Sequence, residues 1–303
     1  MNKDKGHIET DLKLERLEKR LTKEYSEATK ELQKKLKLKL KELETWEENN
    51  EKLKSLNIDE YNRKRQGKLF EIDRKKKIIK NLSLDISAVN QQAMDILNDT
   101  NLSIYAINHN YILGSIVKQG ADISFEIYNK NIVYNLLKKN TKLFPKRKIN
   151  VSKDLLWNYK KIKSELIQGI IQGKSTRDIA KNFQKVTDMN KNSAIRNAQT
   201  SVTNVENKAR IDGIKYAESL GIELFKEWKS SGDNHTRDSH AMLNGKKIDI
   251  DDKFSNGLMY PGDPSGRPEE VYNCRCCLVE TLKKDYRDKE ETKAWEEYKK
   301  RHK

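Results

Sequence analysis

Residues 14–43 read LERLEKRLTKEYSEATKELQKKLKLKLKEL, and the spacing of their apolar side chains decides the fold class. These positions recur in steps of three or four residues, on average about 3.6, which is the period of a straight α-helix. They are Leu14, Leu17, Leu21, Tyr25, Ala28, Leu32, Leu36, Leu40 and Leu43. A left-handed coiled coil prefers a period of about 3.5. The stretch therefore predicts one long amphipathic helix over residues 8–56 that packs on a neighbouring helix.

The composition agrees with long helices around a thin core. Of the 303 residues, 35% are hydrophobic and 36% are charged, and there are four prolines. A surface helix buries one stripe and leaves the rest in water, so it tolerates many charges. Proline would interrupt such helices. The length allows two domains, or one domain with an extension.

Changes of composition along the chain predict four parts. They are a helical N-terminal arm with short helices (1–150), a helical bundle (151–221), a small C-terminal module (222–283) and a charged helical tail (284–303). Within the first part, Gly114 and Gly120 are expected to separate short helices, because glycine weakens a helix interior.

The C-terminal module is predicted to contain short β-strands joined by long loops. The segment IELFKEWKSS alternates so that Leu224, Lys226 and Trp228 would share one side of a strand. KKIDI and CLVETL are further strand candidates, and three of the four prolines lie in residues 261–268. The predicted fold class is α+β: predominantly long helices and a helical bundle, with a small loop-rich C-terminal module that contains β-structure.

Two polar motifs concentrate the reactive side chains of this module. Residues 232–240 read GDNHTRDSH and residues 273–277 read NCRCC. A small, loop-rich module buries little apolar core and usually needs additional stabilisation from a cross-link or a bound metal. Zinc held by thiolates and imidazoles provides such stabilisation. In a strand, Cys274 and Cys276 would share a face and Cys277 would point away.

The predicted zinc ligands are therefore His240, Cys274 and Cys276, with His235 in the fourth position. Asp233 and Asp238 are the alternatives for that position. The cysteines are separated by one residue, whereas structural zinc sites typically use two. The competing interpretation is a set of small buried cysteines beside polar residues that hold turns.

A catalytic site is the less favoured interpretation of the same residues. The carboxylates and histidines of GDNHTRDSH could form a hydrolase site, and Cys274 with His240 could form a nucleophile and its base. No glycine-rich phosphate loop, HExxH or G-x-S-x-G motif accompanies them. The sequence therefore predicts a protein that is not an enzyme.

The net charge of +16 predicts a polyanionic partner, and double-stranded DNA bound without sequence preference is the first candidate. The charge is distributed along the chain with no single basic stripe, which favours general affinity over base reading. A lysine-rich genome would produce the same excess. No signal peptide and no membrane span are expected, because the first residues, MNKDKGHIETDLKLE, contain no apolar stretch and no apolar run reaches about 18 residues. The three clustered cysteines favour a reducing cytoplasm.

The module also resembles a known family. The segments EWKSSGDNHTRDSHAMLNGK and YPGDPSGRPEEVYNCRC resemble the phage head morphogenesis family, the minor head proteins of tailed phages that are related to the phage Mu F protein. The resemblance covers roughly residues 155–282. The matching positions are Trp228, Asp233, Thr236, Arg237, His240, Gly245, Pro261, Gly262, Asp263, Asn273, Cys274, Arg275 and Cys276. His235 departs from the family's pattern, which weakens it as a ligand.

The resemblance implies a low-copy structural protein of the phage capsid. Such a protein would act near the portal during prohead assembly, in the host cytoplasm, and would remain in the virion. Its implied partners are the portal and other capsid or scaffold proteins, with packaged DNA as a further partner. Similar domains also occur fused to toxins, so the rival hypothesis is a metal-dependent nuclease or a toxin-like effector enzyme.

Overall fold

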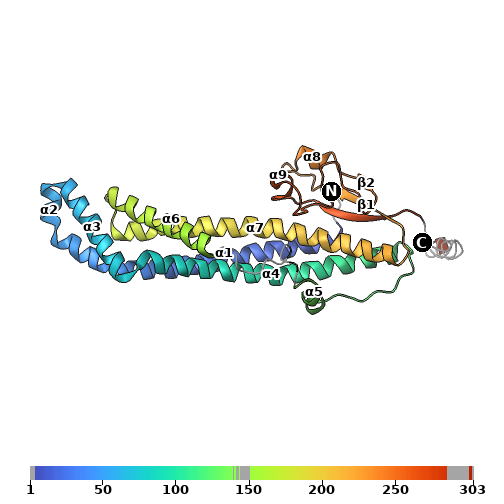
Figure 1. The fold of residues 1–303 in the computed structure, drawn as a ribbon, viewed down its shortest axis with the longest axis horizontal. Helices are drawn as coiled ribbons and strands as arrows, with labels where there is room; N and C mark the ends of the chain where they lie inside the picture. The colour runs from blue at the N-terminus through green and yellow to red at the C-terminus, as the bar shows by residue number, and fades with distance from the viewer. Residues whose placement is uncertain (1–3, 139, 141–142, 144–150, 285–299, 302–303) are drawn as a thin grey trace. The chain divides into compact units, whose positions relative to one another are not determined.

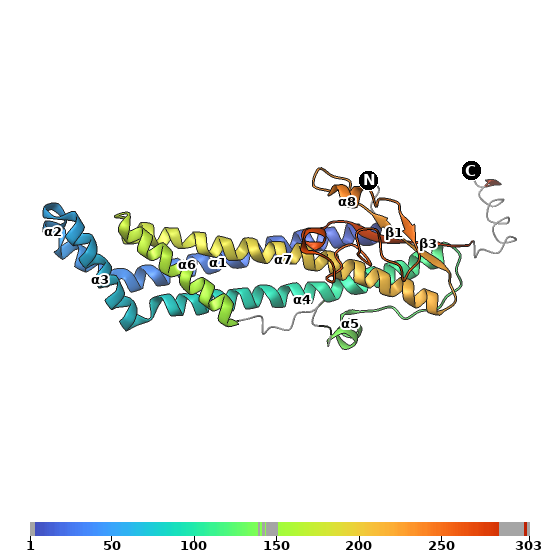
Figure 2. The same cartoon turned by 45° about the horizontal axis from the view of Figure 1, so that its top comes forward.

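The computed structural model describes residues 4–138, 140, 143, 151–284 and 300–301, and it is 71% helical with one small antiparallel sheet. The long helices are α1 (Lys5–Asn49), α3 (Ile58–Lys76), α4 (Ile78–Lys118), α6 (Val151–Ile171) and α7 (Thr176–Ser219). The short ones are α2 (Glu51–Leu56), α5 (Lys130–Leu137), α8 (Asp238–Ala241) and α9 (Pro268–Val271). The strands are β1 (Leu224–Lys229), β2 (Lys247–Ile248) and β3 (Cys277–Leu282). Figures 1 and 2 show these elements in two views. The predicted α+β class is confirmed.

The chain forms two compact units, each assembled from separated segments. The first unit contains Met1–Leu17, Leu97–Pro145 and Arg196–Lys303, and the second contains Glu18–Ile96 and Lys146–Ile195. The tail predicted at 284–303 lies almost wholly outside the described residues.

Helix α1 follows the predicted apolar stripe closely. Seven of its nine positions are buried, and Leu14 and Ala28 are half-buried. The helix ends at Asn49 rather than near residue 56, where the separate short helix α2 follows. The periodicity therefore predicted the helix correctly, but the predicted C-terminal end lies seven residues beyond the observed one.

Helix α4 shows that the expected break at Gly114 is wrong. The helix runs unbroken for 41 residues from Ile78 to Lys118. Its neighbours Ile112, Leu113 and Ile116 are fully buried in the core of the first unit. A glycine in a helix interior lowers stability by only about 1 kcal/mol relative to alanine. The burial of these three apolar side chains outweighs that loss. The break at Gly120 is confirmed: this residue has a φ of 106° just beyond the helix end.

The sheet of the first unit has the order β2-β1-β3, with both pairs antiparallel. All three strand candidates are confirmed. In β1 the side chains of Leu224, Lys226 and Trp228 are buried, while the alternate ones are half-buried. Residue 229 of β1 pairs with Cys277 at the start of β3, so the cysteine motif enters the sheet beside the end of β1. This pairing positions the site described next.

The second unit has its own apolar core. Side chains of α1, α3, α4, α6 and α7 contribute, among them Leu36, Leu40, Ile72 and Phe183. The buried Arg65 of α3 donates to the carbonyl oxygens of Ile170 (3.4 Å) and Lys174 (2.6 Å) and pairs with Glu47 (2.6 Å). Arg65 thereby satisfies carbonyl groups at and just beyond the C-terminal end of α6.

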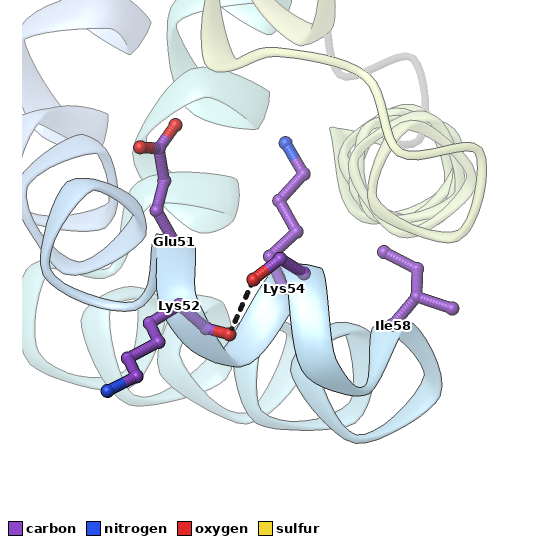
Figure 3. A pocket seen from close by; sticks show the side chains of 5 residues that line it. Glu51, Lys52, Lys54 and Ile58 are labelled. Carbon is purple, nitrogen blue, oxygen red and sulfur yellow. Dashed lines mark hydrogen bonds between the residues drawn. The ribbon is translucent and has the colours of Figure 1, made fainter.

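The second unit also has an open hollow beside α2 (Figure 3). It is lined by Glu51, Lys52, Lys54, Ser55 and Ile58.

Candidate metal centre

His240, the second histidine of GDNHTRDSH, is buried and packs against an aromatic side chain of the sheet. His240 is on the short helix α8, and its side chain is only 2% exposed. Its ring meets the buried Trp228 of β1 edge-on, with centroids 5.0 Å apart and planes at 72°. Trp228 in turn packs edge-on against Phe254 at 5.1 Å. Strand alternation in β1 thus places the indole that orients the imidazole.

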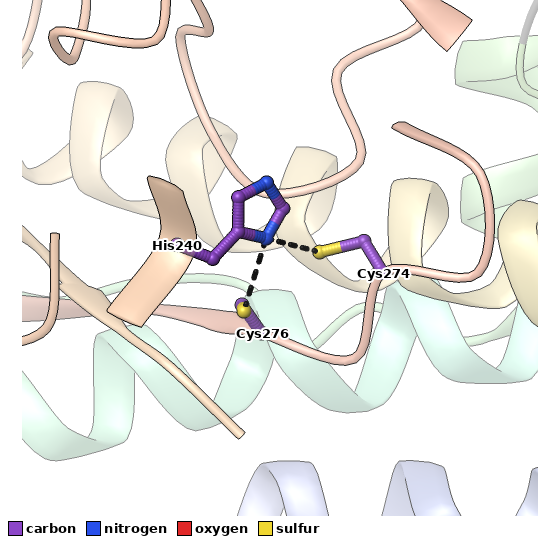
Figure 4. Close-up of side chains that lie close together, drawn as sticks. All are labelled: His240, Cys274 and Cys276. Carbon is purple, nitrogen blue, oxygen red and sulfur yellow. Dashed lines mark hydrogen bonds between the residues drawn. The ribbon is translucent and has the colours of Figure 1, made fainter. Parts of the chain in front are cut away.

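The two cysteines predicted to share a face lie against that imidazole (Figure 4). His240 Nδ1 is 3.6 Å from Cys274 Sγ and 3.5 Å from Cys276 Sγ. The three donor atoms all lie within 4.8 Å of one another, and all three residues are buried. The predicted grouping of His240, Cys274 and Cys276 is therefore present. Cys277 is buried apart from this group, and burial raises the pKa of its thiol.

Helix α7 holds the backbone of the cysteine motif through a ladder of polar side chains. Thr203 Oγ1 donates to the carbonyl oxygen of Cys274 (2.6 Å), and Asn207 Nδ2 donates to that of Cys276 (3.1 Å). Asn207 Oδ1 also accepts the amide of Leu278 (2.6 Å), and Thr200 Oγ1 accepts that of Asn273 (3.1 Å). The spacing from Thr200 through Thr203 to Asn207 follows one face of a helix. These bonds fix the cysteine backbone independently of any ligand.

A carboxylate orients the far side of the imidazole ring. Glu270 Oε2, on α9, lies 2.9 Å from His240 Nε2. Glu270 also accepts from Ser239 Oγ (3.1 Å) and Asn256 Nδ2 (3.4 Å). Histidines that bind metals commonly pair their second nitrogen with a carboxylate in this way. Glu270 was not among the residues that the sequence singled out.

The two thiols differ in their ease of ionisation. A hydrogen bond from the Cys274 thiol, together with the His240 ring and the Ser231 amide, lowers the pKa of Cys276 to about 5. The same hydrogen bond to Cys276, with burial, raises the pKa of Cys274. These contacts therefore favour the thiolate of Cys276, which is the form that binds metals.

His235 lies away from this group. Its side chain is exposed, and its backbone amide donates to Asp233 Oδ1 (3.0 Å) within the turn. Among the described residues, only His240, Cys274 and Cys276 form a group of potential metal ligands. The structure thus does not bring His235, Asp233 or Asp238 to the cysteines.

Asp233, Arg237 and Arg275 hold the loops around the site. Asp233 Oδ1 accepts from Arg275 Nη2 at 2.8 Å, which ties GDNHTRDSH to NCRCC. Arg237 donates to the carbonyl oxygen of Tyr272. The Gly245 amide donates to the carbonyl oxygen of Trp228 (2.8 Å), closing the turn between β1 and β2. Asn273 adopts a φ of 56° just before the first cysteine.

The PGD loop packs directly on α7. Pro261, Gly262 and Asp263 are all buried. Gly262 has a φ of 76°, and a Cβ there would lie 3.1 Å from the backbone nitrogen of Asn204. Asp263 accepts from the amides of Met259 (3.1 Å) and Ser265 (2.9 Å). Only glycine permits this approach of loop and helix.

A buried ion network, which the sequence did not reveal, lies beside this ladder on α7. Arg210 is fully buried and binds both carboxylate oxygens of Asp4 at 2.8 Å. It also lies 3.2 Å from Glu206, whose carboxylate is 2.8 Å from His7 Nδ1. The network links the first turn of α1 to α7, and a further bond from Arg210 reaches the carbonyl oxygen of Leu278 (3.0 Å).

Replacing His7 with glutamine is expected to make stability less dependent on pH. Burial opposes protonation of the His7 ring, but the charge of Glu206 and its hydrogen bond prevail and raise the pKa of His7 above 6.5. The stabilisation is complete below pH 6.5 and is lost as the pH rises through the raised pKa. Urea unfolding of both chains between pH 5.5 and 9 would show a difference that shrinks with rising pH. A constant difference would contradict this assignment.

The site lies in a part of the chain that matches a known protein family. Residues 160–279 match the family described as "Phage Mu protein F like protein", a span that includes α7, β1, β2, the first half of β3 and all three grouped ligands. In these residues the chain is similar to the phage Mu F-like head proteins, and the match to a minor head protein described next agrees with that similarity.

Two characterised relatives extend the comparison. Minor head protein GP7 of Bacillus phage SPP1 is 23% identical over 280 residues, which cover 88% of this chain and 85% of that protein. NAD(+)--arginine ADP-ribosyltransferase EFV of Enterococcus faecalis is 30% identical over 193 residues. That match covers 59% of this chain but spans only 39% of the enzyme's length. No solved structure matches the chain significantly. Among the described residues, no helix is both long and apolar enough to cross a bilayer.

Proposed function

We propose that the chain is a minor capsid protein that acts in prohead assembly beside the portal and remains in the virion. The supporting observation is the match to a minor head protein over 88% of this chain and 85% of that protein. Assembly takes place in the host cytoplasm, and the portal and other capsid or scaffold proteins are the proposed partners.

Particles made by a phage that carries this gene would test the proposal. Quantitative mass spectrometry of purified proheads and virions should find the chain in both, at low copy relative to the major capsid protein. Cross-linking in proheads should connect it to the portal. Its absence from both kinds of particle would reject a capsid role, whereas presence without portal cross-links would reject only the portal location.

We propose that the same protein holds packaged duplex DNA without sequence preference. The support is its net charge of +16. Binding that depends on phosphate contacts weakens by orders of magnitude between about 50 and 200 mM salt. Gel shifts with two unrelated duplexes at these concentrations should show equal retention at low salt and loss at high salt. No retention at low salt would exclude DNA binding.

We also propose that His240, Cys274 and Cys276 bind Zn²⁺. Two thiolate donors and one imidazole form a soft donor set, which suits zinc. Their convergence within 4.8 Å and the Glu270 carboxylate behind the ring support the assignment. The role proposed for the metal is structural, because all three ligands are at most 2% exposed and no substrate would reach them. Elemental analysis of the purified chain should find about one zinc per molecule.

We infer that the chain acts without catalysis. The match to the ADP-ribosyltransferase leaves 61% of that enzyme uncovered (100 − 39), so the enzyme's activity is not assigned to this chain. Incubation with NAD⁺ and an arginine-containing peptide, and separately with plasmid and Mg²⁺ or Zn²⁺, should give no product. ADP-ribosylation by the chain would establish the transferase alternative. Plasmid cleavage that is lost in His240→Ala would establish the nuclease.

A further inference from the structure

Helix α1 gathers four lysines on one face. Lys30, Lys34, Lys37 and Lys41 are separated by four, three and four residues, and all four side chains are exposed. At 100° per residue they fall within an arc of about 60°, and they extend over about 16 Å of helix. The charge is spread along the chain with no single basic stripe, yet these four lysines share one face of α1. The cause is that lysines scattered in sequence at helical spacing converge once the helix forms.

The four lysines, here called the lysine face, lack carboxylate partners. Within the described residues, no carboxylate oxygen lies within 4.0 Å of any of their ammonium groups, although other lysines of the same unit are paired. The neighbouring acids bind other groups: Glu31 pairs with Lys35 (2.9 Å) and Glu42 with Lys76 (2.8 Å). Glu44 accepts from Thr176, and Glu27 lies 3.9 Å from Lys23. The positive charge of the lysine face is thus locally uncompensated.

The face points to solvent and is extended by α7. The opposite side of α1 holds Leu32, Leu36 and Leu40, which are 0–3% exposed. At its edge, Gln33 Nε2 donates to the carbonyl oxygen of Lys181 (3.5 Å), which brings α7 alongside. Lys181 has a side chain 63% exposed and only a loose pair with Asp178 at 3.7 Å. A second helix therefore adds positive charge beside the face.

We propose that the lysine face is the surface by which this chain binds the phosphate backbone of duplex DNA. This inference rests on the DNA binding proposed above and adds its location. Lysine presents a point charge to a phosphate, and a row of such charges at intervals of about 4.5–6 Å suits contacts that read no bases. An acidic protein partner is less well matched, because stable protein interfaces are usually centred on aromatic or apolar anchors.

The test compares two variants that lose equal charge. In the first, Lys30, Lys34, Lys37 and Lys41 are all changed to glutamine. In the matched control, four exposed lysines of α6 in the same unit are changed: Lys153, Lys160, Lys161 and Lys163. Each variant has a net charge of +12 (16 − 4). Circular dichroism should be unchanged in both, and so should the urea midpoint of the lysine-face variant, because its side chains are exposed. A small decrease in the urea midpoint is expected in the control, because Lys161 and Lys163 lie over the rings of Trp157 and Phe70.

Dissociation constants for two unrelated duplexes are then measured across a salt series. If each lysine meets one phosphate, the slope of log affinity against log salt should fall by about 3.6 in the lysine-face variant. The control should change by less than about 1. Equal losses in the two variants would overturn the location and leave DNA binding intact. Failure of the unaltered chain to bind at low salt would remove both proposals.

Discussion

Replacement of Arg210 by leucine is expected to destabilise the chain by about 3–5 kcal/mol. Arg210 is fully buried and binds Asp4 through two 2.8 Å hydrogen bonds. Its Nε donates to Asn108 Oδ1 (2.9 Å), and Glu206 lies 3.2 Å away. Without the guanidinium, the half-buried carboxylate of Asp4 and the buried carboxylate of Glu206 would lose most of their compensating charge. Removing one partner of a buried ion network costs far more than the net stabilisation of the network.

Arg196 provides the matched control for this substitution. It lies on the same helix, its side chain is exposed, and Arg196→Leu should change stability by less than about 0.5 kcal/mol. Urea unfolding followed by circular dichroism gives both values. The double variant with Asp4→Asn should show a coupling of about 1–3 kcal/mol, because the two residues share one network. A loss in Arg210→Leu no larger than in Arg196→Leu would show that the network contributes little.

The long helices were predictable to the extent that their burial is periodic. The leucines of α1 repeat along one face, so local spacing alone identified the helix. The break predicted at Gly114 was wrong because helix propensity is only a weak local preference. The packing of Ile112 and Leu113 overrides it, and that packing depends on residues distant in sequence. The end of α1 at Asn49 was likewise not marked by a strong local signal.

The residues of the candidate site were likewise predictable only where a local sequence pattern indicated them. Cys274 and Cys276 precede β3 rather than lying in a strand, but the predicted pairing of these two thiols with His240 is present. The supports of the site were missed, because they come from elements far along the chain. Asn207 bonds to the backbone of a residue 69 positions away, and Glu270 reaches His240 across 30 positions. The spacing of Thr200, Thr203 and Asn207 on α7 was the one readable signal for a polar helix face.

Changing Cys276 to serine is expected to reduce bound zinc from about one per chain to nearly none. Cys276 is the thiol whose pKa is lowered to about 5, so it supplies the thiolate that zinc requires at neutral pH. A serine hydroxyl does not ionise there and is a poor ligand for zinc. Cys277→Ser is the matched control: this adjacent cysteine is also buried but lies outside the ligand group, so zinc should be retained.

Glu270→Gln separates the orientation of His240 from the metal ligands themselves. Glutamine keeps the size of the side chain but removes the charge 2.9 Å from His240 Nε2, so zinc affinity should fall by about 10–100-fold without loss of stoichiometry. Glu269→Gln, an exposed change on the same helix, should leave affinity unaltered. Competition with a chromogenic chelator measures affinity, and substitution by cobalt reports thiolate ligation through its absorption. Zinc absent from the unaltered chain would exclude the metal and leave His240 as a buried packing residue. If the Glu270 and Glu269 variants bind zinc equally well, the zinc site stands but Glu270 is not needed for it. The α7 ladder and Trp228 would then suffice to place the ligands.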